Sequence, residues 1–191
     1  MSLPTAGTPA TFYAHKILVE DWAGSLSAAQ FNWKPSAKSW SVAECLAHLK
    51  RLAEMYAPAL ETKLATTSLP AGSPPFTYGW FARFTVRSFG AEGTRKLTSP
   101  ADFLPEATGT DDASNLDPAT VVGAFGALQD RLAAALDGAK GLDLSAAKMP
   151  SPAVKVLRLP LAAWFDMLAG HQARHLQQAQ RVMASPGFPR A

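Results

Sequence analysis

Residues 159–178 read LPLAAWFDMLAGHQARHLQQ, and apolar side chains, two histidines and a glutamine recur there every three or four positions. This spacing places the recurring side chains on one face of an α-helix, the face that packs against neighbouring helices in a bundle. We therefore expect a helix from about residues 159–160 to residue 184, with both histidines directed into the protein. The recurring positions are Trp164, Leu168, His171, His175, Gln178 and Val182.

Two further long helices are expected in the first third of the chain. The first covers about residues 11–25, where apolar side chains again fall at helical spacing. The second begins after Ser41, because Ser41 and Glu44 match the N-cap and N3 positions of a capping box. Its apolar repeat continues to Tyr56, and Pro58 is expected to bend or end the helix.

One more long helix is expected from Asp117 to Gly138. Asp117 is a favourable N-cap and a proline follows it at the first helical position, whereas Gly138 is a typical residue at a helix end. Residues 78–89 predict a short, aromatic-rich helix. Residues 90–116 hold several prolines and a polar run and look irregular.

These elements predict an all-α protein, a four-helix bundle with long connections and a short extra helix. Strand signals are scarce, since Ala, Leu, Gln, Lys and Arg dominate the periodic segments. No internal repeat is visible, and no linker is long and polar enough to separate two domains. We therefore expect residues 1–191 to form one domain, with its core over about residues 12–184.

The composition excludes several classes of function. Hydrophobic residues make up 48% of the chain, enough for a core, and the net charge of +3 comes without any run of Lys and Arg. Nucleic acid is therefore not an expected partner. No stretch of about 18 apolar residues and no signal-like N-terminus are present, so we expect a cytoplasmic protein without a membrane partner. The one cysteine, Cys45, excludes a disulfide framework within the chain.

Three of the four histidines are expected to face the bundle interior together. His171 and His175 lie one helical turn apart on the apolar face, and His48 falls in the stripe of the second long helix. Burying uncharged imidazoles without partners costs roughly 1–3 kcal/mol per group, and a bound metal ion removes that cost. We predict that the three hold one divalent metal ion with open coordination positions. The alternative is that each is a hydrogen-bonded core histidine.

Other polar residues near this predicted site carry weaker signals. The spacing of the histidine pair is that of zinc proteases, but Gln172 stands where those enzymes have a glutamate base, so a protease is not expected. His15 is interpreted as a partly buried or surface histidine. Cys45 fits a small buried hydrophobe better than a fourth ligand or redox thiol. Gln178 is compatible with orienting a water molecule or with packing alone.

Several segments together resemble the DinB-like superfamily, the metal-binding four-helix proteins also described as DinB/YfiT-like. The resemblance lies in residues 26–35 (LSAAQFNWKP), 39–49 (SWSVAECLAHL), 95–105 (RKLTSPADFLP) and 159–178, and it covers roughly residues 12–184. The pairing of W-S-x-x-E-x-L-x-H-L with H-x-x-x-H-x-x-Q is fairly specific to the family. It implies a four-helix bundle fold.

The resemblance also implies His48, His171 and His175 as the three metal ligands. We expect Zn or Ni, with Fe or Mn as alternatives, since imidazole nitrogen suits several of these metals. Family members with known activity include S-transferases that use bacillithiol or mycothiol, and a mycothiol-dependent maleylpyruvate isomerase. The chain departs from many members at Ser151-Pro152, where they have His-Pro, so a nearby substrate contact is expected to differ.

Two functions from different classes follow. The first is a metal-dependent transferase or hydrolase acting on a small molecule, with a low-molecular-weight thiol as a candidate co-substrate. The alternative is a non-catalytic, metal-containing stress-response or binding module. An open pocket around the histidines would favour the enzyme, and a metal sealed by Phe and Trp would favour the module. No separate catalytic residue is identified. The resemblance further implies a homodimer, with residues 76–89 as candidate contact surface.

Overall fold

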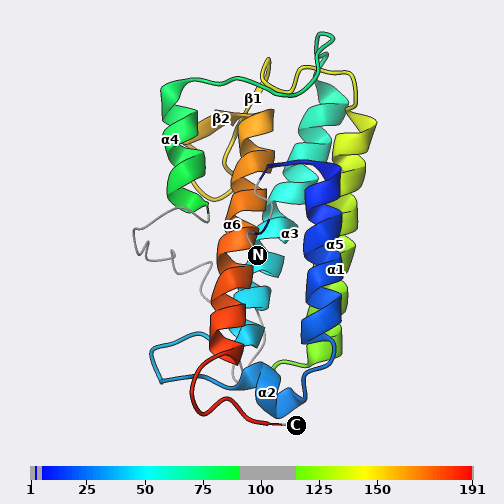
Figure 1. Cartoon of the computed structure of the whole chain (residues 1–191). Coiled ribbons are helices and arrows are strands. Elements are labelled where there is room, and N and C mark those ends of the chain that lie inside the picture. Colours follow the sequence, from blue (N-terminus) through cyan, green and yellow to red (C-terminus); the bar gives the residue numbers. More distant parts are fainter. Residues whose placement is uncertain (1–2, 4–5, 91–114, 191) are drawn as a thin grey trace.

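Four long helices run side by side along the protein (Figure 1), as predicted. The computed structural model describes residues 3, 6–90 and 115–190. Helix α1 packs on α5, α5 packs on α3, and α3 packs on α6, which also contacts α1. The long helices are α1 (Pro9–Ala23), α3 (Val42–Thr66), α5 (Pro118–Gly138) and α6 (Leu161–Met183). The all-α, four-helix bundle prediction is therefore confirmed.

Smaller elements join the long helices. Helix α4 (Trp80–Phe89) lies against α6, where the sequence predicts a short helix. Helix α2 (Ala28–Asn32) connects α1 to α3. Strands β1 (Lys148–Pro150) and β2 (Arg158–Pro160) form an antiparallel hairpin directly before α6. None of the helices in the described ranges is both long and apolar enough to traverse a bilayer.

The capping signals explain where the long helices begin. The Ser41 side chain accepts a hydrogen bond from the Glu44 backbone N–H at 3.0 Å, and the Ser41 N–H donates to Glu44 Oε2 at 2.7 Å. Lys34 pairs with the other carboxylate oxygen of Glu44 at 2.8 Å. The Asp117 side chain caps α5 by accepting from the Thr120 N–H. These bonds satisfy helix donors that would otherwise lack partners.

The prediction for Pro58 is wrong where it ends the helix, since α3 continues to Thr66 with Pro58 inside it. A proline inside a helix removes one backbone hydrogen bond and costs about 3 kcal/mol. Ala57 and Leu60, on either side of Pro58, are almost completely buried. The packing of this second half of α3 therefore outweighs the cost of the proline.

Two small elements were not predicted from the sequence. Helix α2 lies between the first two predicted helices, where no element was predicted, although Ser27 and Gln30 form a capping box there. The hairpin strands have only three residues each and both end in proline, so they are too short for an alternating sequence pattern to be recognised. Residues 95–105, which contribute to the family resemblance, and most of the irregular segment 90–116 lie outside the described residues.

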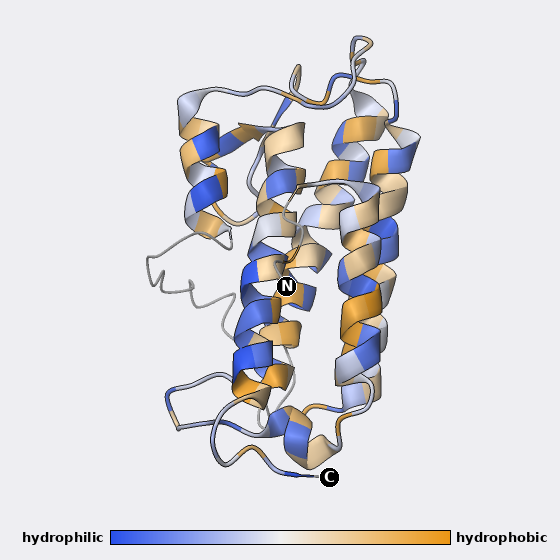
Figure 2. Ribbon diagram, in the orientation of Figure 1, coloured by the Kyte–Doolittle hydropathy of each residue, from blue (hydrophilic) through white to orange (hydrophobic). Residues whose placement is uncertain are grey.

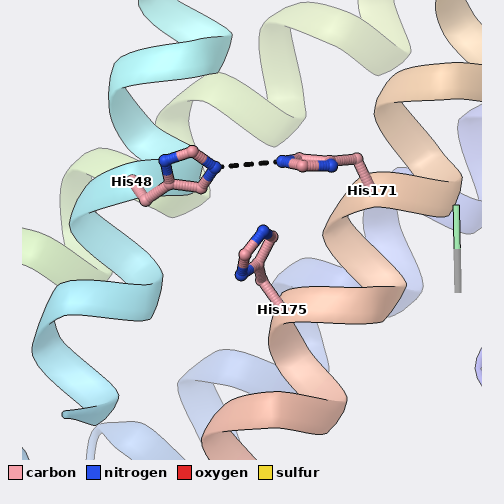
Figure 3. A group of neighbouring side chains, drawn as sticks. All are labelled: His48, His171 and His175. Atoms are coloured by element: carbon pink, nitrogen blue, oxygen red, sulfur yellow. Dashed lines mark hydrogen bonds between the residues drawn. The ribbon is translucent and has the colours of Figure 1, made fainter. Parts of the chain in front are cut away.

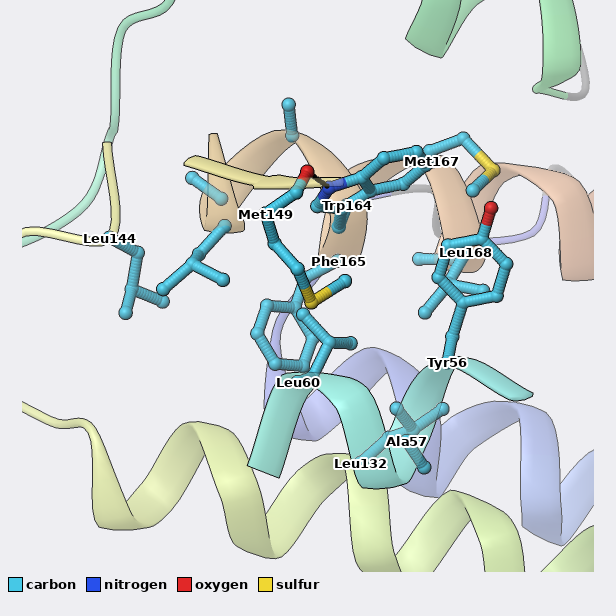
Figure 4. Close-up of a cluster of buried hydrophobic side chains, with 14 of the residues drawn as sticks. Tyr56, Ala57, Leu60, Leu132, Leu144, Met149, Trp164, Phe165, Met167 and Leu168 are labelled. Carbon is cyan, nitrogen blue, oxygen red and sulfur yellow. Dashed lines mark hydrogen bonds between the residues drawn. The ribbon is translucent and has the colours of Figure 1, made fainter. Parts of the chain in front are cut away.

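The bundle interior holds two clusters of buried apolar side chains. One lies around Leu60, Leu132 and Trp164, and part of it is drawn in Figure 4. The other, toward α2, includes Phe125 and Leu176. On α6, His171 and His175 lie between Ala169, the last residue of the first cluster, and Leu176, the first residue of the second, while His48 on α3 lies beside Leu49, where the second cluster ends. Polar positions on α6 are visible among its apolar ones in Figure 2. The fold thus places the histidines midway along the α3–α6 contact.

Replacing Leu132 with Ala should lower the free energy of unfolding by about 2–5 kcal/mol, because Leu132 is completely buried and its loss leaves a cavity. The control is Val156→Ala, at a side chain that is 90% exposed, which should change the free energy by less than about 0.5 kcal/mol. Urea unfolding followed by circular dichroism measures both. Equal effects of the two substitutions would contradict this packing.

Candidate metal centre

Three imidazole rings face one another between α3 and α6. His48 comes from α3, and His171 and His175 come from successive turns of α6 (Figure 3). One nitrogen from each ring can be chosen so that all three lie within 4.8 Å of one another. The Nε2 atoms of His48 and His171 are 3.0 Å apart, and the ring of His175 directs a nitrogen toward this pair. The structure therefore brings together the three histidines singled out from the sequence.

A backbone carbonyl orients the His171 ring. Nδ1 of His171 lies 3.1 Å from the carbonyl oxygen of Phe89, the last residue of α4. Because a carbonyl can only accept, Nδ1 carries the proton and donates. The lone pair of neutral His171 then sits on Nε2, the atom that faces His48. A carbonyl partner on the outer nitrogen is the usual way in which proteins orient a metal-binding histidine.

The surroundings keep two of these rings uncharged. Desolvation, together with repulsion from His48, lowers the pKa of His171 to about 3, although the Phe89 carbonyl opposes this. Burial also lowers the pKa of His175 well below its ordinary value, and the other two histidines and Arg174 add to the effect. Neutral imidazole is the form that binds metal ions, since the charged form has no free lone pair.

Trp40 forms one wall of the site. Its ring stacks on His175 with ring centroids 5.4 Å apart and planes 20° from parallel. The centroid of the His48 ring lies 5.1 Å from that of Trp40. Trp40 directly precedes the capping residue Ser41, so the start of α3 determines where this ring lies. Trp40 is the first residue of the W-S-x-x-E-x-L-x-H-L motif, but no role was predicted for it. Only its position beside the capping box could have indicated one.

All three histidines line a cavity of about 920 Å³. It follows the groove between α3 and α6 and has two chemically different ends. Near the start of α6 its lining is mainly apolar, and toward the end of α6 it includes three cationic side chains. The apolar end is lined by Leu52, Leu157, Trp164 and Met167, and the cationic end by Lys38, Arg174 and Arg181. The histidines are therefore not sealed in by Trp40 and Phe89.

The other candidate residues take up different places. Cys45 is completely buried in the apolar cluster near Phe125, where burial raises the pKa of its thiol, so the interpretation as a small hydrophobe fits. His15 is more buried than predicted, and its Nδ1 donates to Gln172 Oε1 at 2.9 Å. Gln178 lines the cavity and lies near enough to His175 to influence its pKa.

The donor set fits a divalent transition metal. Within the described residues the cluster contains imidazoles alone, without a thiolate or carboxylate. If His171 Nε2 bears a lone pair, His48 Nε2 at 3.0 Å must either donate a proton to it or share a cation with it. Two nitrogens that both lie about 2.0–2.1 Å from one ion are about 3 Å apart when they subtend roughly a right angle, so the observed separation suits shared coordination.

Comparison with known proteins agrees with the fold. No curated protein matches the chain. Among solved structures, YfiT from Bacillus subtilis, described as a probable metal-dependent hydrolase with an unusual four-helix bundle topology, superposes with a TM-score of 0.61 at 15% sequence identity. The match covers 95% of this chain and 86% of that chain, and at this identity it shows a shared fold. The sequence pattern of the DinB superfamily matches residues 12–179, which is most of the chain. The protein therefore belongs to the DinB superfamily, as the sequence resemblance implied.

Proposed function

We propose that His48, His171 and His175 hold one divalent metal ion and that the protein is a metal-dependent hydrolase of a small molecule. The observation that carries this proposal is the position of the three converging imidazoles within a cavity of about 920 Å³. A structural site would have its ligands closed off, whereas three protein ligands beside an accessible cavity are typical of catalytic sites. The non-catalytic binding module lacks such support.

Each part of the site has a task in this proposal. The two neighbouring turns of α6 and the facing turn of α3 hold the imidazoles, and the Phe89 carbonyl orients one of them. Trp40 covers His175 and limits access of water on that side. When bound, a divalent ion would activate a water molecule or a thiol as nucleophile and polarise a carbonyl group. Gln172 points to His15 and takes no part.

Hydrolysis is favoured over thiol transfer by the likeness to YfiT, which is described as a probable metal-dependent hydrolase. A low-molecular-weight thiol as co-substrate is the alternative implied by the family resemblance, since the same site could activate its sulfur. Zn or Ni is the metal that we propose first, with Fe or Mn next, because the ligands are imidazoles. The cytoplasm stays the predicted location.

Protein loaded with Zn²⁺ or Ni²⁺ should hydrolyse at least one member of a panel of small chromogenic esters and amides. Chelation should abolish this activity and added metal should restore it, because the reaction needs the ion to activate water. His48→Ala should be inactive at every metal concentration. The panel is assayed by absorbance with and without bacillithiol or mycothiol. Product that forms only when a thiol is present would contradict hydrolysis and favour the transferase.

His171→Ala should abolish stoichiometric Zn²⁺ binding, because two imidazoles hold a divalent ion poorly. The helical melting transition should change little, since the two apolar clusters form the core without the ion. The matched control is His15→Asn, which keeps a nitrogen donor toward Gln172 and should still bind metal. Metal analysis and thermal melts with and without chelator measure these effects. An unfolded His171→Ala variant would instead indicate a structural ion.

We also propose a homodimer that buries the outer face of α4. Trp80 and Phe84 on this helix are 73% and 59% exposed, and such apolar surface is unusual on a monomer. Sedimentation at micromolar concentration should give twice the chain mass of 20.3 kDa, and the double variant Trp80→Ser/Phe84→Ser should give the chain mass. Ile17→Ser, on the exposed side of α1, is the control. A wild-type species of 20.3 kDa would exclude this dimer.

A further inference from the structure

The apolar end of the cavity contains one pair of hydroxyl groups. Tyr56, from α3, and Ser151, from the turn after β1, both line the cavity, and their oxygens are 2.7 Å apart. Both residues are almost fully buried. Either oxygen could donate in an isolated pair, so the direction of this hydrogen bond has to come from the other contacts of the two residues.

The backbone around Ser151 determines that direction. Ser151 Oγ accepts two backbone hydrogen bonds, from the N–H groups of Ala153 at 3.2 Å and Val154 at 3.0 Å. A serine hydroxyl has two lone pairs and one proton, so both lone pairs are occupied. Its proton must then be donated to the oxygen of Tyr56. The phenol proton of Tyr56 is left over, and the structure gives it no acceptor among the described residues.

The position of the Tyr56 ring is also restricted. Its ring packs on Trp164 with centroids 5.1 Å apart, and Trp164 is itself held by donation from Nε1 to the Met149 carbonyl at 2.9 Å. Burial raises the pKa of Tyr56, although the bond with Ser151 opposes this, so the phenol keeps its proton at neutral pH. The Tyr56 hydroxyl is therefore a hydrogen-bond donor whose orientation is already fixed. A water molecule in the cavity can accept this hydrogen bond until a ligand displaces the water.

We propose that the Tyr56 hydroxyl donates a hydrogen bond to a neutral acceptor, such as a carbonyl oxygen, in the ligand that occupies this cavity. Ser151 is the residue that positions it. The inference rests on the proposed function, because it places the reacting end of the same ligand at the histidines. Tyr56 follows His48 by eight residues on α3, which is about 12 Å along the helix axis.

The acceptor is neutral because of the surroundings of Tyr56. Its end of the cavity is lined by apolar side chains such as Leu52, Met167 and Leu157, whereas the described cationic lining residues belong to the other end. Burying an unpaired carboxylate among apolar groups costs far more than burying a carbonyl that receives a hydrogen bond. The ligand is thus an elongated molecule with a largely apolar body and a carbonyl-type group remote from the metal-binding end.

Matched hydroxamates test this inference on the Zn²⁺-loaded protein. The hydroxamate group binds the ion, and the tail of graded length ends in a methyl ketone or in the equally shaped methyl-substituted alkene. The quantity to compare is the affinity for the ketone divided by the affinity for the alkene, at the tail length that binds best. This ratio should be at least about fivefold higher in wild type than in Tyr56→Phe, as expected for one neutral hydrogen bond. Titration calorimetry measures the affinities and involves no turnover.

The controls separate a ligand contact from a structural role. Affinity for the alkene, Zn²⁺ content and melting temperature should be unchanged in Tyr56→Phe, and Tyr13→Phe, on α1, should behave as wild type. Ser151→Ala should reduce the ketone preference, and adding it to Tyr56→Phe should reduce it no further, because serine acts through the phenol.

Two results would overturn the inference in different ways. An unchanged ratio in Tyr56→Phe at every tail length would contradict the tyrosine contact and leave the metal-dependent hydrolase intact. The same conclusion would follow if both tails lost affinity equally. Failure of every hydroxamate to bind Zn²⁺-loaded wild-type protein would contradict the open metal site itself, and the inference would fall with it.

Discussion

Three imidazoles meet across the contact between α3 and α6, and the elements around them are arranged so that the rings stay together. Burial makes a positive charge on His171 and His175 costly, and the neighbouring imidazoles add to this cost. Apolar clusters at both ends of the helix contact provide the packing that keeps the rings together. The capping box at Ser41 and Glu44 then defines where α3 begins, and with it the positions of His48 and Trp40.

Much of this arrangement could be predicted because it depends on local spacing. The face shared by His171 and His175 is a property of one helix, and the caps at Ser41 and Asp117 need only neighbouring residues. The inward stripes of the two helices predicted that His48 joins His171 and His175, and the family resemblance implied the same three residues. Pro58 was misjudged because its local cost is visible in the sequence, whereas the burial of Leu60 that offsets it is not.

The parts of the site that escaped prediction depend on contacts distant in sequence. Tyr56 looks like one more residue of an apolar stripe until Ser151, 95 positions later, is found against its hydroxyl. Trp40 belongs to a recognisable motif, yet its stacking on His175 requires the folded bundle. Phe89 orients His171 through its backbone carbonyl, a group that every residue has. Sequence therefore indicated the histidines, while the cavity around them required three dimensions.

The turn between β1 and β2 lies outside the four long helices, yet it supplies Ser151, Val154 and Leu157 to the cavity wall. The histidines come from α3 and α6 alone. Evolution or an engineer could therefore exchange this turn for another of different length and chemistry without redesigning the bundle. A library of variants confined to residues 151–157 would therefore change the wall of the cavity while the helices that carry the histidines stay unchanged.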